Sequence, residues 1–404
     1  MPSFPSNFTG TQGCWHILDA GSIWLKEFAS ALGTMAPTLN WCPEIRNFGH
    51  WEHWEKFDES SDPAVKTIRF PLQRGYGRFP IARLLPPETR ILDRLLQRSA
   101  NAEDSTLLVT SPFYAPVAEL WPGRVVYYLT DLTKEYAGMN RNQVVGLDRR
   151  ICAVASLVCP NSRRIADYLC GEAGCDPQKI VVIPNATRAS NILSKPLMKP
   201  AEAPADLVDW PRPIVGVIGN LAGNIDWVLL ADAVAQSPDV TWAFVGPTEM
   251  EIPDRRHRQL RQELMGKGGR VRFLGSKPYS QLAHYARAFD VALIPYLKKE
   301  PTISGSATRF YEHLAACRPI LASRAHGELL TKEPLLKLVN NGEEIAGYLD
   351  LLRARDFSDG YEDLRWSVSR HETWQARAAA ILAAADERGF PAAEPYLASL
   401  NQIA

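Results

Sequence analysis

The chain has 404 residues, and its 45 lysine and arginine residues equal its 45 aspartate and glutamate residues in number. This balance argues against bulk nucleic acid as the main partner, and an apolar fraction of 46% is typical of a soluble globular protein. Seven cysteines without a Cys-x-x-Cys pair argue against a disulfide framework or a structural zinc site. No apolar run approaches the length of a bilayer, and the first twenty residues lack a signal-like segment, so we expect a cytoplasmic protein.

The first half of the chain alternates short apolar runs with helical patterns. Such alternation predicts right-handed crossovers and a mostly parallel sheet that is covered on both faces. The expected strands are 38–42, 65–72, 106–110, 124–129, 157–160 and 180–184. The expected helices are 24–32, 88–99, 142–156 and 163–171.

A stretch rich in proline and alanine then predicts a linker, after which the alternation resumes. The expected strands of this second series are 214–218, 241–245, 271–274, 290–294, 319–322 and 336–339. The expected helices are 227–236, 280–288, 308–316 and 343–354, followed by C-terminal helices within 361–387 and 394–400. The predicted organisation is therefore an N-terminal Rossmann-like domain at 1–195, a linker at 196–213, a second Rossmann-like domain at 214–360 and C-terminal helices at 361–404.

The loop Ser304-Gly305-Ser306-Ala307 and the helix that follows it predict a phosphate site. The helix begins with Thr308 and Arg309, and its free backbone N–H groups and positive dipole end favour an anion. Arg309 and Glu312 are three residues apart and share one helix face. The guanidinium could lie over a diphosphate while the carboxylate holds the two hydroxyls of a ribose. The alternative is an ordinary helix whose Ser and Thr residues only cap its start.

Three glycine turns follow strands of the second series and are expected at the same rim of the sheet. They contain Gly219 with Asn220, Gly246 and Gly275. Ligands of an open parallel sheet bind beyond the carboxyl ends of its strands, where glycine lets backbone approach a phosphate. Each glycine alone could instead only permit a turn. Together with the loop at Ser304, they predict one nucleotide-binding rim.

From about residue 105 to residue 387 the chain resembles GT-B sugar-nucleotide glycosyltransferases, of the family 1 and family 4 kind found in bacterial polysaccharide and cell-surface glycan synthesis. The most specific match is Arg309-Phe310-Tyr311-Glu312-His313-Leu314-Ala315-Ala316. Other matching segments are 125–131, 181–186, 214–219, 242–247, 273–275 and 289–295.

The resemblance implies an α/β GT-B fold of two Rossmann-like domains with an interdomain cleft and C-terminal helices that pack back on the first domain. It implies a nucleotide diphosphate sugar as donor substrate on the second domain, and a glycan, lipid-linked or small-molecule acceptor on the first. No metal or other cofactor is expected. It places the side chain at Arg309 on the diphosphate, that at Glu312 on the ribose, and the loop ending at Gly275 near the base.

The chain departs from the resemblance at two points. Many retaining members carry a second carboxylate eight residues before the position of Glu312, where this chain has Ser304, so retention of configuration is not assumed. Residues 1–104 match poorly. We therefore keep two alternatives to a glycosyltransferase: a sugar-nucleotide epimerase on the same fold, and a nucleotide-binding partner subunit without catalysis.

The transfer needs a base for the acceptor hydroxyl and positive charge for the leaving diphosphate. Arg309 suits the second task. For the first we favour Asp131, which follows the strand 124–129 and so lies at the rim of the first domain. Its alternative role is a cap for a helix at 132–135. His16 and Glu27 are the fallback bases.

Two further clusters in the first hundred residues carry weaker hypotheses. His50 and His53 could share a metal ion, but no third ligand has a recognisable spacing, and we expect none. The basic segment 66–98 could contact an anionic membrane surface or a lipid diphosphate, although a solvated face is the favoured interpretation. Its basic residues are Lys66, Arg69, Arg74, Arg78, Arg83, Arg90, Arg94 and Arg98.

Overall fold

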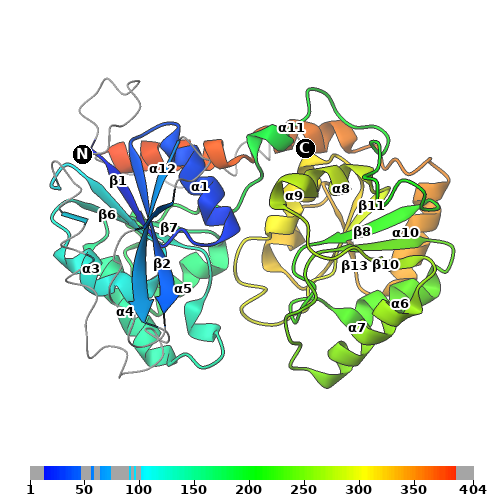
Figure 1. The fold of residues 1–404 in the computed structure, drawn as a ribbon, viewed down its shortest axis with the longest axis horizontal. Coiled ribbons are helices and arrows are strands. Elements are labelled where there is room, and N and C mark those ends of the chain that lie inside the picture. The colour runs from blue at the N-terminus through cyan, green and yellow to red at the C-terminus, as the bar shows by residue number, and fades with distance from the viewer. Residues whose placement is uncertain are drawn as a thin grey trace. The chain divides into compact units, whose positions relative to one another are not determined.

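The structure of the chain, a computed structural model, describes residues 13–46, 56–58, 64–73, 91, 95–96 and 102–387. The histidine pair at 50 and 53, the C-terminal helix at 394–400 and most of the helix at 88–99 and of the basic segment 66–98 lie outside these residues. The chain forms two compact units (Figure 1). Unit 1 comprises Met1–Pro184 and Trp374–Ala404, and unit 2 comprises Asn185–Thr373.

Unit 1 is built on a sheet in the order β3-β4-β2-β1-β5-β6-β7. All neighbouring strands are parallel except β3, which runs antiparallel to β4 at the edge. The order reverses between β1 and β5, so the unit is doubly wound, with its switch point at the carboxyl end of β1. The strands are β1 Trp15–Leu18, β2 Thr38–Arg46, β3 Lys56–Asp58, β4 Lys66–Gln73, β5 Thr106–Val109, β6 Arg124–Leu129 and β7 Leu157–Pro160.

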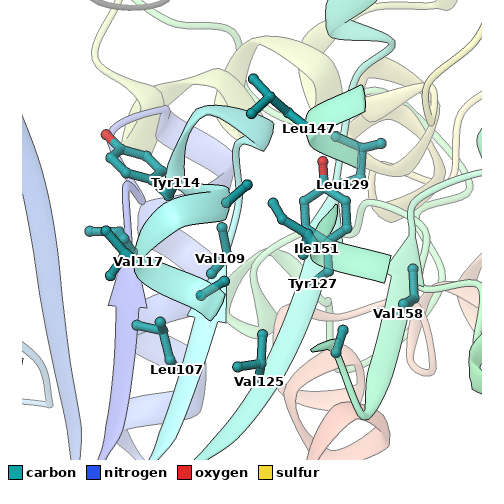
Figure 2. Close-up of a cluster of buried hydrophobic side chains, with 14 of the residues drawn as sticks. Leu107, Val109, Tyr114, Val117, Val125, Tyr127, Leu129, Leu147, Ile151 and Val158 are labelled. Carbon is teal, nitrogen blue, oxygen red and sulfur yellow. The ribbon is translucent and has the colours of Figure 1, made fainter. Parts of the chain in front are cut away.

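The helices of unit 1 bury the sheet. Figure 2 shows Leu107, Val125 and Tyr127 of β5 and β6 against Val117 and Ile151 of the helices, in one buried apolar cluster. Helix α12 of unit 1 packs against α1 and β7, which confirms that the C-terminal segment returns to the first domain. The helices are α1 Ile23–Gly33, α3 Ala115–Leu120, α4 Arg141–Val154, α5 Arg163–Gly171 and α12 Trp374–Asp386, with 3-10 turns η2 Pro112–Tyr114, η3 Thr133–Glu135 and η4 Pro177–Lys179.

The strand expected at 180–184 is wrong. Only one isolated bridge, between Ile180 and Val158 of β7, forms there. The amides of Val181 and Ile183 donate to carbonyls of β7. The next bridge of a ladder would also need an N–H from Pro160, which proline lacks, so no strand propagates. The sequence also missed β1, which is the central strand of the sheet, and the short edge strand β3.

Unit 2 contains an all-parallel sheet in the order β10-β9-β8-β11-β12-β13. By rank along the chain this is 3-2-1-4-5-6, the order of dinucleotide-binding doubly wound folds. Its switch point lies between β8 and β11. The strands are β8 Ile214–Ile218, β9 Thr241–Val245, β10 Val271–Phe273, β11 Val291–Ile294, β12 Ile320–Ser323 and β13 Lys337–Val339.

The helices of unit 2 include one that the sequence did not predict, α7. Its sequence is strongly polar, and only Arg261 and Leu264 are buried. The available signal was Asp254, whose side chain accepts the amide of His257 at 2.9 Å and caps the helix. The helices are α6 Trp227–Gln236, α7 Arg255–Lys267, α8 Leu282–Ala288, α9 Thr308–Ala315, α10 Gly342–Arg353 and α11 Glu362–Ser369, with 3-10 turns η5 Ala189–Asn191, η6 Tyr279–Gln281 and η7 Gly327–Thr331.

The limits of the two units differ from the expected domain boundaries. The expected linker 196–213 is counted in unit 2. The C-terminal helical segment divides at Thr373, because α11 packs against α9 of unit 2 whereas α12 packs against α1 of unit 1. Among the described residues, no helix has both the length and the apolar character needed to cross a membrane.

The close contact at Gly216 of β8 gives a test of the packing in unit 2. A Cβ added at Gly216 would lie 2.0 Å from ring atoms of Phe289, which is fully buried. We expect Gly216→Ala to lower the free energy of unfolding by about 1–3 kcal/mol, because the ring must move in a filled core. Gly146→Ala in α4 is the matched control, since no atom lies within 4 Å of the added Cβ. It should raise stability by about 0.5–1 kcal/mol. Denaturant unfolding of both variants that shows no difference between them would contradict this packing.

Candidate functional site

The glycine turns at the switch point of unit 2 lie against one another, as the sequence predicted. The amide of Gly246 donates to the carbonyl of Gly275 at 2.9 Å, and that of Gly219 donates to the carbonyl of Val245 at 2.9 Å. Gly219 has φ 116° and Gly246 has φ 149°, conformations that other residues rarely adopt. A Cβ at Gly246 would lie 1.9 Å from the carbonyl oxygen of Gly219. Gly246 is therefore needed for the close approach of the two loops, and Gly219 for the close approach of Arg309.

Arg309 in the first turn of α9 fastens this helix to the end of β8. Its Nε donates to the carbonyl of Ile218 at 2.7 Å, and one Nη donates to the carbonyl of Asn220 at 2.7 Å. Its guanidinium lies 4.9 Å from the ring centroid of Tyr296. The other Nη is buried and has no hydrogen-bond partner among the described residues. One charged N–H group at the switch point therefore remains for an anion.

Glu312, one turn further along α9, is buried and accepts hydrogen bonds on both oxygens. Oε1 accepts from the hydroxyl of Tyr279 at 2.5 Å. Oε2 accepts from Nδ2 of Asn191 at 3.1 Å and from the hydroxyl of Thr187 at 3.3 Å. None of these partners was predicted. They come from η6 and from the segment that opens unit 2, more than 30 residues away along the chain.

The hydroxyl groups of the predicted phosphate loop have partners within unit 2. Ser306 accepts the amide of Asn185 at 2.9 Å, and Thr308 accepts Nδ2 of the same asparagine at 2.7 Å. The hydroxyl of Ser304 donates to the carboxylate of Glu300. A carboxylate thus contacts the position at which the resemblance lacked one. Ser304 itself is 1% exposed.

A second carboxylate lies at the start of α9. Oε2 of Glu328 accepts the amide of Ala307 at 2.6 Å, and its other oxygen accepts the hydroxyl of Tyr311. No side chain of the loop caps the helix, so the alternative that Ser and Thr serve only as caps is not observed. The negative charge of Glu328 is the kind of group that the positive end of a helix dipole stabilises.

Arg261 of α7 holds the loops after β8 and β9 together. One of its Nη atoms donates to the carbonyls of Leu221 at 3.2 Å, Thr248 at 2.9 Å and Met250 at 3.1 Å. This side chain therefore fixes the loops after β8 and β9 relative to α7. The sequence gave no signal for it, because α7 itself was missed.

Two buried histidines flank this region. Burial lowers the pKa of His313 to about 3, with a further contribution from the charge of Arg309, and neither ring nitrogen has a partner among the described residues. Burial likewise lowers the pKa of His326, whose ring lies 5.1 Å from that of Tyr296. Both are neutral at physiological pH. Arg309 therefore contributes a buried positive charge next to Gly219.

In unit 1, Asp131 follows β6 at the carboxyl edge of the sheet. Burial raises its pKa to about 6, although hydrogen bonds with Tyr136 and Thr130 favour the charged form. The turn η3 has no side-chain cap, so Asp131 does not cap it. A carboxyl group with a pKa near neutrality is suited to general base catalysis.

The fallback base His16 lies in the core of unit 1. It is fully buried, and its Nδ1 accepts Nε1 of Trp41 at 3.1 Å. Burial lowers its pKa to about 4. This geometry makes it a packing residue. Glu27 lies in the middle of α1 and is partly buried.

The sequence missed Asp19, which lies directly after β1 at the switch point of unit 1. Its φ of 76° is unusual for a residue other than glycine. Burial raises its pKa, while the hydroxyl of Tyr114, which donates to Oδ2 at 3.1 Å, opposes the shift. A strained, half-buried carboxyl at a switch point is a candidate functional group. The only signal in the sequence was its place after a run that we had not recognised as a strand.

No cluster of three or more histidine, cysteine, aspartate or glutamate side chains able to hold a metal ion occurs in the part of the chain that the structure describes. The expectation of a metal-independent reaction stays a prediction.

Comparisons with known proteins agree with this architecture. Residues 212–352 match the family model described as glycosyl transferases group 1. The chain is 21% identical over 362 residues to the putative teichuronic acid biosynthesis glycosyltransferase TuaH of Bacillus subtilis (strain 168), covering 87% of this chain and 89% of that protein.

Solved structures share the fold across nearly the whole chain. HepE of Anabaena, in complex with UDP and glucose, is 18% identical with a TM-score of 0.65, covering 91% of this chain and 98% of that one. Sucrose-phosphate synthase of Thermosynechococcus elongatus is 15% identical with a TM-score of 0.66, covering 97% and 100%. At these identities the likeness shows the fold.

Together, the family model, the curated relative and the fold identify the chain as a glycosyltransferase with the GT-B fold, as the sequence predicted. They give no support to the alternative of a sugar-nucleotide epimerase. The roles of individual residues stay predictions.

The raised pKa of Asp131 predicts a pH dependence of stability. Burial raises the pKa of Asp131 in the folded protein to about 6, whereas the usual pKa of an aspartate is 3.8. Between these two pH values the folded state binds more protons than the unfolded state, so the free energy of unfolding falls as pH rises through this window. Above about pH 6 the loss is complete. Asp131→Asn does not titrate. Its stability relative to the wild type should therefore rise by about 1–2 kcal/mol between pH 5 and pH 7.5. Denaturant unfolding at both pH values measures this, and a constant difference would contradict the shift.

Proposed function

We propose that the chain transfers a sugar from a uridine diphosphate sugar to the hydroxyl of a glycan, lipid-linked or small-molecule acceptor, without a bound metal ion. The observation that carries this proposal is the buried guanidinium of Arg309, which lies against Gly219 and has one Nη without a hydrogen-bond partner among the described residues, one helical turn from the carboxylate of Glu312. A diphosphate would satisfy the first group, and a ribose the second.

The choice of uridine rests on fold relatives. HepE was crystallised with UDP-glucose and with UDP, and a trehalose-6-phosphate protein of E. coli was crystallised with UDP-2-fluoro glucose. A role in polysaccharide synthesis is suggested by the name of TuaH. We propose a cytoplasmic protein, with a membrane-peripheral contact through the basic segment 66–98 as an additional hypothesis for a lipid-linked acceptor.

In the proposed reaction, the diphosphate lies against Arg309 in a site shaped by Gly219, Asn220, Gly246 and the loop from Ser304 to Thr308. The loop at Gly275 lies near the base. Arg309 stabilises the negative charge that develops on the leaving diphosphate. Asp131 accepts the proton of the acceptor hydroxyl, and Asp19 is the second candidate for this task because it lies at the switch point of unit 1.

The proposal is tested by incubating the purified full chain with UDP-glucose, UDP-galactose and UDP-N-acetylglucosamine and analysing the products. Release of UDP with transfer of the sugar to water or to an added acceptor supports it. An isomerised sugar nucleotide, or binding without turnover over many hours, overturns the proposed activity. Full turnover in the presence of a strong chelator is expected if no metal takes part.

Arg309→Lys tests the diphosphate site. A lysine offers one ammonium group and cannot replace both the bonds to the loop and the spare N–H. We expect UDP to bind more weakly by about 1.5–3 kcal/mol in titration calorimetry.

Arg318→Lys is the matched control for this variant. Like Arg309, Arg318 is buried, and it donates to two carbonyls, those of Met198 and Phe357, at 2.7 Å each. It should cost stability without weakening UDP binding. Equal UDP affinity in both variants would remove Arg309 from the site.

Asp131→Asn tests the base. Loss of a general base should lower the turnover rate by about 10²–10⁴-fold with donor binding unchanged. Asp19→Asn is compared in parallel, since asparagine also tolerates a positive φ, so that this change mainly removes the charge. If Asp19→Asn loses turnover and Asp131→Asn keeps it, the base is Asp19.

A further inference from the structure

Glu312 is held differently on its two oxygens. Oε2 accepts from Asn191 and Thr187, whose side chains are buried within unit 2. Oε1 accepts from the hydroxyl of Tyr279 at 2.5 Å, and Tyr279 is only partly buried. The first set of donors belongs to the packed interior. The second donor, Tyr279, is more exposed than the first two.

The ring of Tyr279 has its own support. Tyr279 opens the short turn η6, which no side chain caps. The guanidinium of Arg188 lies over the ring, 4.5 Å from its centroid, a distance typical of a cation–π contact. The ring is therefore held from one face without using the hydroxyl. The hydroxyl is the part of the side chain that can leave Glu312 at small structural cost.

A ribose that uses Glu312 meets an occupied carboxylate. Its two hydroxyls would donate to the two oxygens, and Oε1 has a short hydrogen bond from Tyr279 already. An O–H donor from a sugar and an O–H donor from a tyrosine satisfy a carboxylate in the same way. Exchange of one for the other leaves the number of hydrogen bonds to Glu312 unchanged.

We propose that Tyr279 is a specificity-determining residue of the donor site, whose hydroxyl takes the place of a ribose hydroxyl on Glu312 until the nucleotide displaces it. The inference rests on the proposed function. Two consequences follow. Tyr279 lowers the affinity for ribonucleotides, because its hydrogen bond to Glu312 must break before a ribose hydroxyl can bind there. It also lessens discrimination against a nucleotide whose ribose lacks the 2′ and 3′ hydroxyls. With such a nucleotide bound, Tyr279 stays in place and keeps its hydrogen bond to Glu312.

The test compares UDP with 2′,3′-dideoxyuridine diphosphate on the full chain. Tyr279→Phe keeps the ring under Arg188 and removes only the competing hydroxyl. We expect UDP to bind roughly tenfold tighter, the size of a hydrogen bond to a charged group, while the dideoxy compound binds as it does to the wild type. The ratio of the two dissociation constants should rise by the same factor.

Tyr285→Phe is the matched control. It makes the same change six residues later, at a hydroxyl that donates to the carboxylate of Asp206 at 2.9 Å and does not contact Glu312. Both dissociation constants should stay as in the wild type.

Three outcomes overturn the inference. If Tyr279→Phe binds UDP more weakly, the tyrosine contacts the nucleotide or positions Glu312. If both nucleotides change by the same factor, the effect does not pass through the ribose hydroxyls. In either case the wild type still binds UDP, and the proposed function stands. If the wild type binds neither nucleotide, the proposed function fails, and this inference fails with it.

Discussion

The contact between Arg309 and the backbone at the end of β8 is the constraint on which the candidate site of unit 2 depends. It joins the first turn of α9 to the switch point through two carbonyl oxygens, and it needs a residue without Cβ at Gly219, because a Cβ would lie 2.5 Å from Nε. The same contact leaves one charged Nη group without an acceptor among the described residues. A single side chain thus fixes the geometry of the site and supplies its charge. The contact also fixes the position of Glu312, because this residue lies one turn further along the same helix.

Elements with a strong internal pattern were predicted within a residue or two, and others were not. The bounds of β8, β9 and α6 agree with the expectation because the two strands are apolar and fully buried and the helix buries one apolar face. The polar helix α7 carries little apolar pattern. At 180–184 the local pattern was that of a strand, but pairing failed because of Pro160 in the neighbouring strand. The missing N–H belongs to the neighbouring strand β7, so the sequence of 180–184 alone could not reveal it.

The same division holds for the candidate site. Arg309 and Glu312 could be proposed from the sequence, because a charged pair after a loop of small residues has a local signature. The side chains that hold Glu312 could not, since Asn191 lies 121 residues away and its role exists only once the fold brings it there. Asp19 was missed for a different reason. A positive φ at an aspartate is imposed by the surrounding structure and leaves no trace in composition.

Several polar groups at these two rims are held in states that cost stability. Burial disfavours the charged form of Asp131. Both ring nitrogens of His313 are buried and have no hydrogen-bond partner among the described residues. The spare Nη of Arg309 adds a third cost of the same kind. In the middle of a core, apolar residues of similar size would remove such costs. Asp131 follows β6 in unit 1 and Arg309 lies against the end of β8 in unit 2, so each unit keeps such a group at the carboxyl ends of its strands, where open parallel sheets bind ligands. In the proposed function, a diphosphate would supply the acceptor that this Nη of Arg309 lacks among the described residues, so that binding would offset part of the cost of its burial.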